Sequence, residues 1–151
     1  MTTLRRLQET ENRRIQAAIE EAEKATSGEI RVFIDRKCES NVLDSAAYVF
    51  ERLGMNKTEK RNGVLIYLAI ESRQFAVIGD QGIHQHVGDE LWHDVRTSMQ
   101  HFFQLGDFAT GLEQGILRIG EELRRYFPYT EDDVNELPNE IVYGFKDDIQ
   151  P

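Results

Sequence analysis

Several features are scarce or missing in this sequence, and each absence excludes a class of protein. A single cysteine, Cys38, among 151 residues excludes an internal disulfide framework and fits a reducing compartment. The longest apolar run, residues 64–70, is far shorter than the roughly 20 residues that cross a bilayer. The first residues lack the apolar core of a signal peptide. We therefore expect a cytoplasmic protein without membrane insertion.

Basic side chains are also in deficit. The chain has 18 lysines and arginines against 27 acidic residues, a net charge of -9. Phosphate backbones require a basic surface, so this balance argues against a nucleic-acid partner. Residues 129–151 hold seven of the acids and one lysine, so residues 1–128 are only mildly acidic. We place the one candidate boundary at Pro128, between a domain at 1–128 and an acidic tail at 129–151.

The tail leaves two interpretations open. Its apolar residues could dock on the domain or on a partner, or the whole segment could be a partly ordered, solvated tail. The six residues in question are Val134, Leu137, Ile141, Val142, Tyr143 and Phe145.

Hydrophobic periodicity predicts the order helix, strand, helix, strand, strand, helix, helix. Strands are expected at 29–35, 63–70 and 74–79, where apolar residues alternate or run continuously. The first two strands flank a helix, which predicts a parallel pair with a right-handed crossover. The short link at 71–73 predicts a hairpin, so the third strand should run antiparallel. The fold class is therefore α/β, a three-layer α/β/α sandwich around a small mixed sheet.

This topology defines two candidate rims for a functional site. Asp80 follows the third strand and should emerge where the first two strands begin, near residues 27–29 and 61–63. Asp35, Arg36 and Cys38 lie at the opposite end, the carboxyl end of the parallel pair. Open α/β sheets usually bind ligands at that second end. The sequence alone leaves both rims open.

Motifs with strong mechanistic meaning are missing. The sequence has no G-x-x-x-x-G-K-[ST] loop, so any nucleotide chemistry would not be of the P-loop kind. It also has no G-x-S-x-G elbow and no H-E-x-x-H pair.

Four stretches together resemble the TPM domain family, over roughly residues 10–127. They are "TSGEIRVFI", "ERLGMNKTEKRNGVLIYLAI", "RQFAVIGDQGI" and "FQLGDFATGLEQGI". The resemblance implies an α/β/α sandwich, divalent-metal binding, and phosphatase or nucleotide-hydrolysing activity. The family includes a thylakoid-lumen protein linked to photosystem repair and many small bacterial proteins. This chain departs from the common form at Asp80-Gln81, where many members have an aromatic residue.

Carboxylates around the glycine pair are the candidate metal ligands. Asp80, Asp89 and Glu90, with Glu29 from the first strand, offer the oxygen donors that Mg²⁺ or Ca²⁺ prefers. The alternative interpretation is structural, with Asp80 in a turn and Asp89 capping a helix. Zn²⁺ is less favoured, because the histidines show no standard zinc spacing. These histidines are His84, His86 and His93.

The candidate substrate-binding residues flank the same rim: Arg61, Asn62, Gly79 and Gly82. Arg61 could neutralise a phosphate, since guanidinium matches phosphate geometry. Two hypotheses follow, with catalytic residues unassigned. The first is a metal-dependent phosphohydrolase that acts on a phosphate-containing small molecule. The second is a non-enzymatic adaptor or assembly factor that binds a protein partner.

Overall fold

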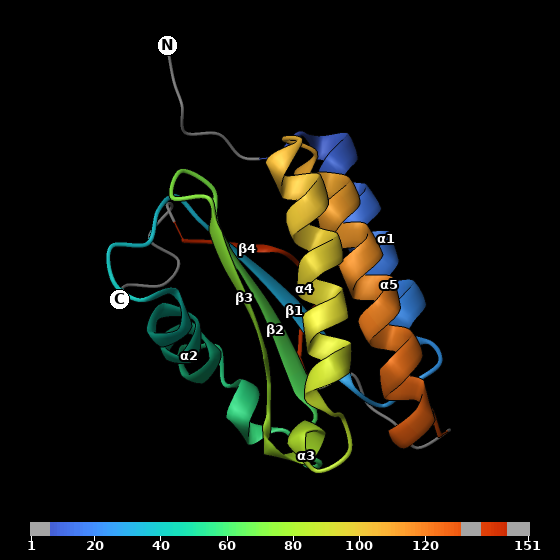
Figure 1. Cartoon of the computed structure of the whole chain (residues 1–151). Coiled ribbons are helices and arrows are strands. Elements are labelled where there is room, and N and C mark those ends of the chain that lie inside the picture. Colours follow the sequence, from blue (N-terminus) through green and yellow to red (C-terminus); the bar gives the residue numbers. More distant parts are fainter. Residues whose placement is uncertain (1–6, 131–136, 145–151) are drawn as a thin grey trace.

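The chain forms a four-stranded sheet with helices on both faces (Figure 1). The computed structural model describes residues 7–130 and 137–144. In chain order the elements are α1 (Glu9–Glu23), β1 (Glu29–Asp35), α2 (Val42–Arg52), η1 (Met55–Lys57), β2 (Gly63–Ala69), β3 (Gln74–Gly79), α3 (Gln81–His84), α4 (Asp89–Gln104), α5 (Phe108–Tyr126) and β4 (Val142–Tyr143). Within the described ranges, no helix has the length and apolar character required to span a membrane.

The predicted strands and their directions are confirmed. β1 pairs with β2 in parallel, from Glu29 opposite Gly63 to Asp35 opposite Ala69. β2 pairs with β3 antiparallel through the short hairpin that the sequence predicted. Arg73 in this hairpin has φ of 54°, the left-handed conformation that tight turns often need.

A fourth strand was not predicted. β4 pairs with β1 in parallel, Val142 opposite Phe33 and Tyr143 opposite Ile34, so the sheet order is β3-β2-β1-β4. Residues 137–144 of the expected acidic tail therefore dock on the domain and extend its sheet. Val134 and Phe145, two of the six tail residues named above, lie outside the described residues.

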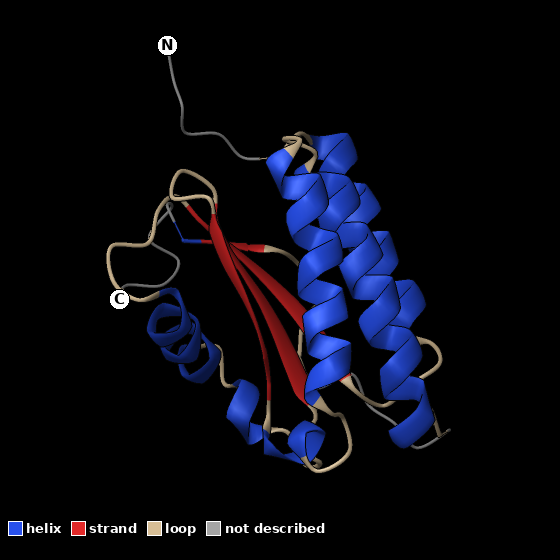
Figure 2. Ribbon diagram, in the orientation of Figure 1, coloured by secondary structure: helices blue, strands red, loops and turns tan. Residues whose placement is uncertain are grey.

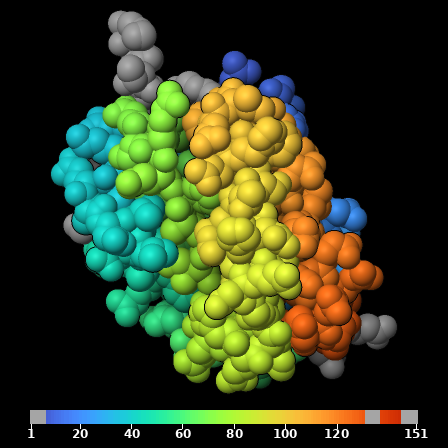
Figure 3. Space-filling view, viewed as in Figure 1, coloured from blue at the N-terminus to red at the C-terminus, as the bar shows by residue number. Residues whose placement is uncertain are grey.

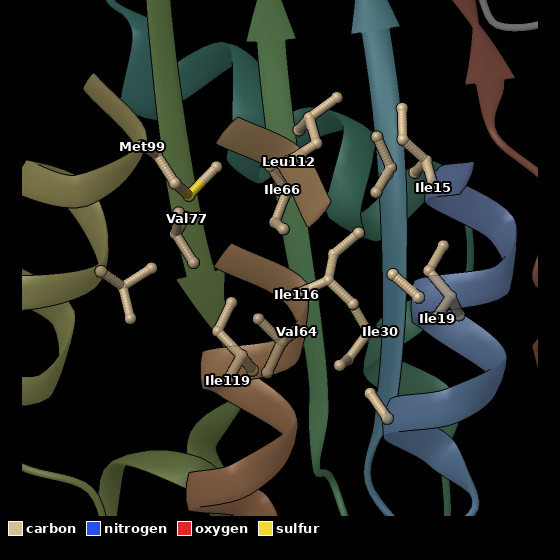
Figure 4. Close-up of a cluster of buried hydrophobic side chains, with 14 of the residues drawn as sticks. Ile15, Ile19, Ile30, Val64, Ile66, Val77, Met99, Leu112, Ile116 and Ile119 are labelled. Atoms are coloured by element: carbon tan, nitrogen blue, oxygen red, sulfur yellow. The ribbon is translucent and has the colours of Figure 1, made fainter. Parts of the chain in front are cut away.

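The three-layer architecture is confirmed, with α1, α4 and α5 on one face of the sheet and α2 on the other (Figure 2). Side chains along a strand point alternately to the two faces of the sheet, so each strand contributes residues to the hydrophobic core on both faces. Ile30, Ile66 and Val77 point toward α1, α4 and α5 (Figure 4). Phe33 and Tyr67 point the other way, toward α2.

Helix starts follow the capping preferences of the sequence. Asn41 Oδ1 accepts hydrogen bonds from the amides of Leu43 and Asp44, so it caps α2. Asp107 caps α5 in the same way. The expected cap at Asp89 is wrong, because Gly88 is the N-cap of α4 and Asp89 is its first residue.

α4 covers the face beside the edge strand β3 (Figure 3).

Candidate functional site

The sheet has two rims at opposite ends of the strands (Figure 1). We call residues 27–29, 60–63 and 79–82 the amino-end rim, because β1 and β2 begin there. We call residues 35–45 and 70–73 the carboxyl-end rim, where β1 and β2 end. The two rims carry different candidate chemistry, and each is described in turn.

An ion pair occupies the centre of the amino-end rim. Asp80 is 7% exposed, and its two carboxylate oxygens accept hydrogen bonds from Arg61 Nε at 2.7 Å and Arg61 Nη2 at 2.9 Å. The hydrogen bond to Asp80 raises the pKa of Arg61. Asp80 Oδ1 also accepts from the Gln81 amide and caps α3. A metal ion at Asp80 would have to compete with a bidentate guanidinium.

Two glycines of this rim, Gly79 and Gly82, are explained by close packing. A Cβ at Gly82 would lie 2.5 Å from the carbonyl oxygen of Lys60, and the Gly82 amide donates to the Arg61 carbonyl at 2.9 Å. A Cβ at Gly79 would lie 3.1 Å from Ile83. Backbone therefore meets backbone at Gly82, which is the close approach that only glycine permits, whereas Gly79 packs against the side chains of Ile83 and Trp92.

The remaining candidate residues of this rim make separate contacts. Asn62 is buried, and its Nδ2 donates to the Ser27 carbonyl at 3.3 Å. Glu29 is 3% exposed, and its Oε1 accepts from the Leu137 amide at 2.6 Å. The carboxylate of Glu29 therefore binds the C-terminal segment, which we define as residues 137–144.

The predicted metal ligands do not assemble into one group. Asp89 and Glu90 are exposed in the first turn of α4. Throughout residues 7–130 and 137–144, no group of three or more His, Cys, Asp or Glu side chains could hold a metal ion. A role in metal binding for Asp80, Asp89, Glu90 and Glu29 stays a prediction.

The carboxyl-end rim contains a cavity of about 610 Å³. Its wall comes from the end of β1, the following loop, one side of α2 from Asp44 to Val49, and Tyr67 on β2. The lining residues are Asp35, Arg36, Lys37, Cys38, Glu39, Ser40, Asp44, Ser45, Tyr48, Val49 and Tyr67. The Cys38 amide donates to Ser72 Oγ at 2.9 Å, which ties the loop to the β2–β3 hairpin.

A hydrogen-bond network crosses this cavity wall. Tyr67 donates from its hydroxyl to Asp35 Oδ2 at 2.8 Å. Burial and the bond to Asp35 raise the pKa of Tyr67, so the phenol stays a proton donor. Ser45 Oγ lies 3.2 Å from Cys38 Sγ and 2.9 Å from Ser40 Oγ. The wall thus offers a positioned carboxylate, hydroxyls and a thiol.

The charges of the lining leave an excess of carboxylate. Lys37 Nζ lies 3.3 Å from Glu39 Oε2, so these two charges offset one another. Asp35 and Asp44 then face one guanidinium, Arg36, among the lining residues. Asp35 itself is held by neutral donors, the Tyr67 hydroxyl and the Arg36 amide, which leave its charge in place. This rim favours a cation, or an anion that arrives with one.

Sequence reasoning identified Asp35, Arg36 and Cys38 at the alternative rim but missed Ser45 and Tyr67. One signal was available for Tyr67, a hydroxyl within the otherwise aliphatic strand "GVLIYLAI". A buried phenol requires a hydrogen-bond partner, and the partner is Asp35 at the end of the neighbouring strand.

Comparison with known families identifies the domain. The sequence pattern of the TPM domain matches residues 4–122, which is most of the chain. The chain belongs to the TPM domain family. Comparison with curated proteins returned no match.

Solved structures place this TPM domain in the same fold. The BA42 protein from the psychrophilic bacterium Bizionia argentinensis is 43% identical, with a TM-score of 0.89 over 95% of this chain and 99% of that one. The N-terminal domain of cg2496 from Corynebacterium glutamicum is 14% identical, with a TM-score of 0.63 over 91% of this chain and 80% of that one. An N-terminal domain from P. gingivalis is 18% identical, with a TM-score of 0.67 over 80% and 78%. The last two likenesses concern the fold alone.

Proposed function

We propose that this TPM domain binds a small phosphate-bearing molecule together with Mg²⁺ or Ca²⁺ at the carboxyl-end rim, and hydrolyses its phosphate ester. The observation that carries the proposal is the cavity of about 610 Å³ whose wall combines carboxylates, a guanidinium and hydroxyls. It lies at the sheet end where open α/β folds usually bind ligands.

The residues present suit a cation only if the ligand shares in binding it. No cluster of three acidic or imidazole ligands occurs in the described part of the chain. Mg²⁺, however, often takes one or two carboxylates and completes its shell with phosphate oxygens and water. Asp35 and Asp44 are the two carboxylates we assign to it. The lining offers oxygen donors and one thiol, which suits Mg²⁺ or Ca²⁺ better than Zn²⁺.

Each lining residue has a role in this proposal. Arg36 would neutralise phosphate charge, and Ser40 and Ser45 would donate hydrogen bonds to phosphate oxygens. Tyr67 orients the carboxylate of Asp35 through its 2.8 Å hydrogen bond. When bound, the cation would polarise a phosphoryl oxygen and lower the pKa of a coordinated water.

The test is a pair of matched substitutions, one at each rim. Mg²⁺ and Ca²⁺ are titrated calorimetrically into the protein with and without inorganic phosphate, and hydrolysis of para-nitrophenyl phosphate is then measured. Asp35→Asn should weaken cation affinity by about ten-fold or more, about 1.4 kcal/mol for one hard-cation ligand. Asp80→Asn, the same chemical change at the amino-end rim, should leave affinity unchanged.

The opposite result would assign the metal site to the other rim. If Asp80→Asn abolishes cation binding while Asp35→Asn does not, the metal binds the amino-end rim, where the sequence first suggested it. If the wild-type protein binds neither ion nor phosphate, the proposal fails and the adaptor hypothesis gains support.

A further inference from the structure

The C-terminal segment lies along the edge of β1 on the side away from β2 (Figure 1). Among the described residues, two pairs join it to the sheet, Phe33 with Val142 and Ile34 with Tyr143. Such a short ladder supplies few backbone hydrogen bonds. Other contacts must therefore hold the segment in place.

Side chains supply those contacts at both ends of the segment. The Leu137 amide donates to Glu29 Oε1 at 2.6 Å. Tyr143 is 5% exposed, and its hydroxyl donates to Asn12 Oδ1 on α1 at 2.6 Å. The segment is therefore anchored to β1 near its start and to α1 near its end.

The polar layer beneath the segment is incompletely satisfied. Arg31 is 6% exposed, and its Nη2 reaches the Glu140 carbonyl at the long distance of 3.4 Å. Its Nε is buried without a hydrogen-bond partner among the described residues. Buried charge without full hydrogen bonding is costly, and releasing the segment would let water reach Arg31. The attachment is a candidate two-state element, docked or released.

The last residue of the segment lies against the wall of the carboxyl-end cavity. A Cβ at Gly144 would lie 2.7 Å from Phe33 Cζ and 3.1 Å from Asp35 Oδ1. Any larger residue at this position would have to push these two side chains aside. Docking of the segment therefore confines Phe33 and Asp35 directly.

These contacts continue into the cavity. Val142 packs against the core cluster that contains Phe33 and Tyr67. The rings of Phe33 and Tyr67 are stacked, with centroids 5.8 Å apart and an interplanar angle of 6°. Tyr67 in turn donates to Asp35. An unbroken series of contacts thus joins the C-terminal segment to the carboxylate assigned to ligand binding.

We infer that the C-terminal segment is a detachable strap that sets the geometry of the carboxyl-end cavity, so its docking on β1 raises affinity for the phosphate-bearing ligand and its cation. This inference rests on the proposed function. A carboxylate held in place before binding loses less freedom when the ligand arrives, which strengthens binding. The coupling must also be reciprocal, so ligand should favour the docked state.

Two full-length variants weaken the strap at its C-terminal end, each through a different contact. Gly144→Ala places a methyl group against Phe33 and Asp35, beside the cavity. Asn12→Ala removes the acceptor of the Tyr143 hydroxyl, and Asn12 does not line the cavity. Arg13→Ala, at an exposed position on the same helix, is the matched control for Asn12→Ala. Docking is read from NMR cross-strand contacts between Ile34 and Tyr143, and affinity from calorimetry with Mg²⁺ and inorganic phosphate.

Both variants should lose cross-strand contacts and bind Mg²⁺ and phosphate at least five-fold more weakly, while Arg13→Ala behaves like wild type. Saturating Mg²⁺ and phosphate should restore part of the docked population in Asn12→Ala. Release of the strap with unchanged or tighter binding would overturn the inference. So would two variants whose strap stays docked yet whose affinity falls.

The inference can fail separately from the proposed function. If wild-type protein binds neither Mg²⁺ nor phosphate, the coupling is judged from the NMR resonances of Asp35 and Tyr67 in Asn12→Ala. Shifts that follow the released fraction support the mechanical link, because Asn12 is on α1, which covers the face of the sheet opposite to α2 and the cavity. Unchanged resonances at both residues refute it.

Discussion

Each rim of the sheet has an aspartate beside an arginine, yet the two carboxylates have different hydrogen-bond partners. At the amino-end rim, Asp80 meets the side chain of Arg61 in a bidentate ion pair. At the carboxyl-end rim, Asp35 meets the backbone amide of Arg36 and the hydroxyl of Tyr67. The first carboxylate has its charge compensated, and the second keeps its charge on a cavity wall.

This difference shows that residue type and spacing do not decide which rim has a carboxylate available to bind a ligand. A guanidinium that closes on a carboxylate leaves little for a ligand, whereas neutral donors orient a carboxylate without cancelling its charge. The amino-end rim is accordingly expected to act in stability and the carboxyl-end rim in binding. The predictions below test that division, from the largest expected effect to the smallest.

Gly82→Ala should have the largest effect on stability. The new methyl group would meet the backbone carbonyl of Lys60 at 2.5 Å, where no flexible side chain can yield. Overpacking of this kind costs about 3 kcal/mol in the free energy of unfolding. Gly88→Ala is the control, because no atom lies within 4 Å of its Cβ position; as an N-cap change it should cost about 1 kcal/mol or less. Equal losses in urea denaturation would mean that the corner around Gly82 can relax.

Glu23, which contacts the amino end of β1, should make the free energy of unfolding depend on pH. Its Oε2 accepts a hydrogen bond from the Ile30 amide, and burial raises the pKa of Glu23 to about 7. The folded protein therefore holds this proton more tightly than the unfolded chain does. The contribution of protonated Glu23 to the free energy of unfolding is fully present below about pH 4.5 and is lost as the pH rises through about 7. We expect roughly 2 kcal/mol, after allowing for partial exposure.

Glu23→Gln is the test of this pH dependence. Glutamine keeps an acceptor for Ile30 and cannot ionise, so the variant should lose that part of the slope between pH 4.5 and 7. Unfolding is followed by circular dichroism at several pH values. Identical slopes in wild type and variant would show that the carboxyl group of Glu23 ionises freely in the folded protein.

Asp80→Asn should lower the free energy of unfolding by about 1 to 2 kcal/mol, because asparagine lacks the negative charge and one of the two oxygens that accept from Arg61. The cap on α3 should survive, since asparagine caps as well as aspartate. Urea denaturation measures the change. A stability like that of wild type would mean that the ion pair with Arg61 adds little, and would weaken the distinction between the rims.

Asp89→Asn and Glu90→Gln should have the smallest effects. Both residues are exposed in the first turn of α4, where a lost charge weakens only a favourable interaction with the helix dipole. We expect changes within about 0.5 kcal/mol and no change in Mg²⁺ affinity. A clear loss of Mg²⁺ binding would return these carboxylates to the candidate metal site.

The success of the strand predictions has a local cause. Alternating or continuous apolar residues identify β1, β2 and β3 within a few residues of chain, and a helix or a tight turn between strands determines their relative direction. β4 could not be found this way. It has two residues, it lies between Pro138 and Gly144, and its pairing joins positions more than a hundred residues apart.

The sequence by itself determined the layers, the strand directions and the two ends at which a site could lie, because these follow from local periodicity and connection length. Only the tertiary structure decided how the carboxylates at those ends are engaged. Whether Asp80 meets a guanidinium, Glu29 a backbone amide or Asp35 a phenol depends on which distant side chains the folded sheet brings within 3 Å. Hydrogen bonds are short and directional, so no pattern along the chain can replace that geometry.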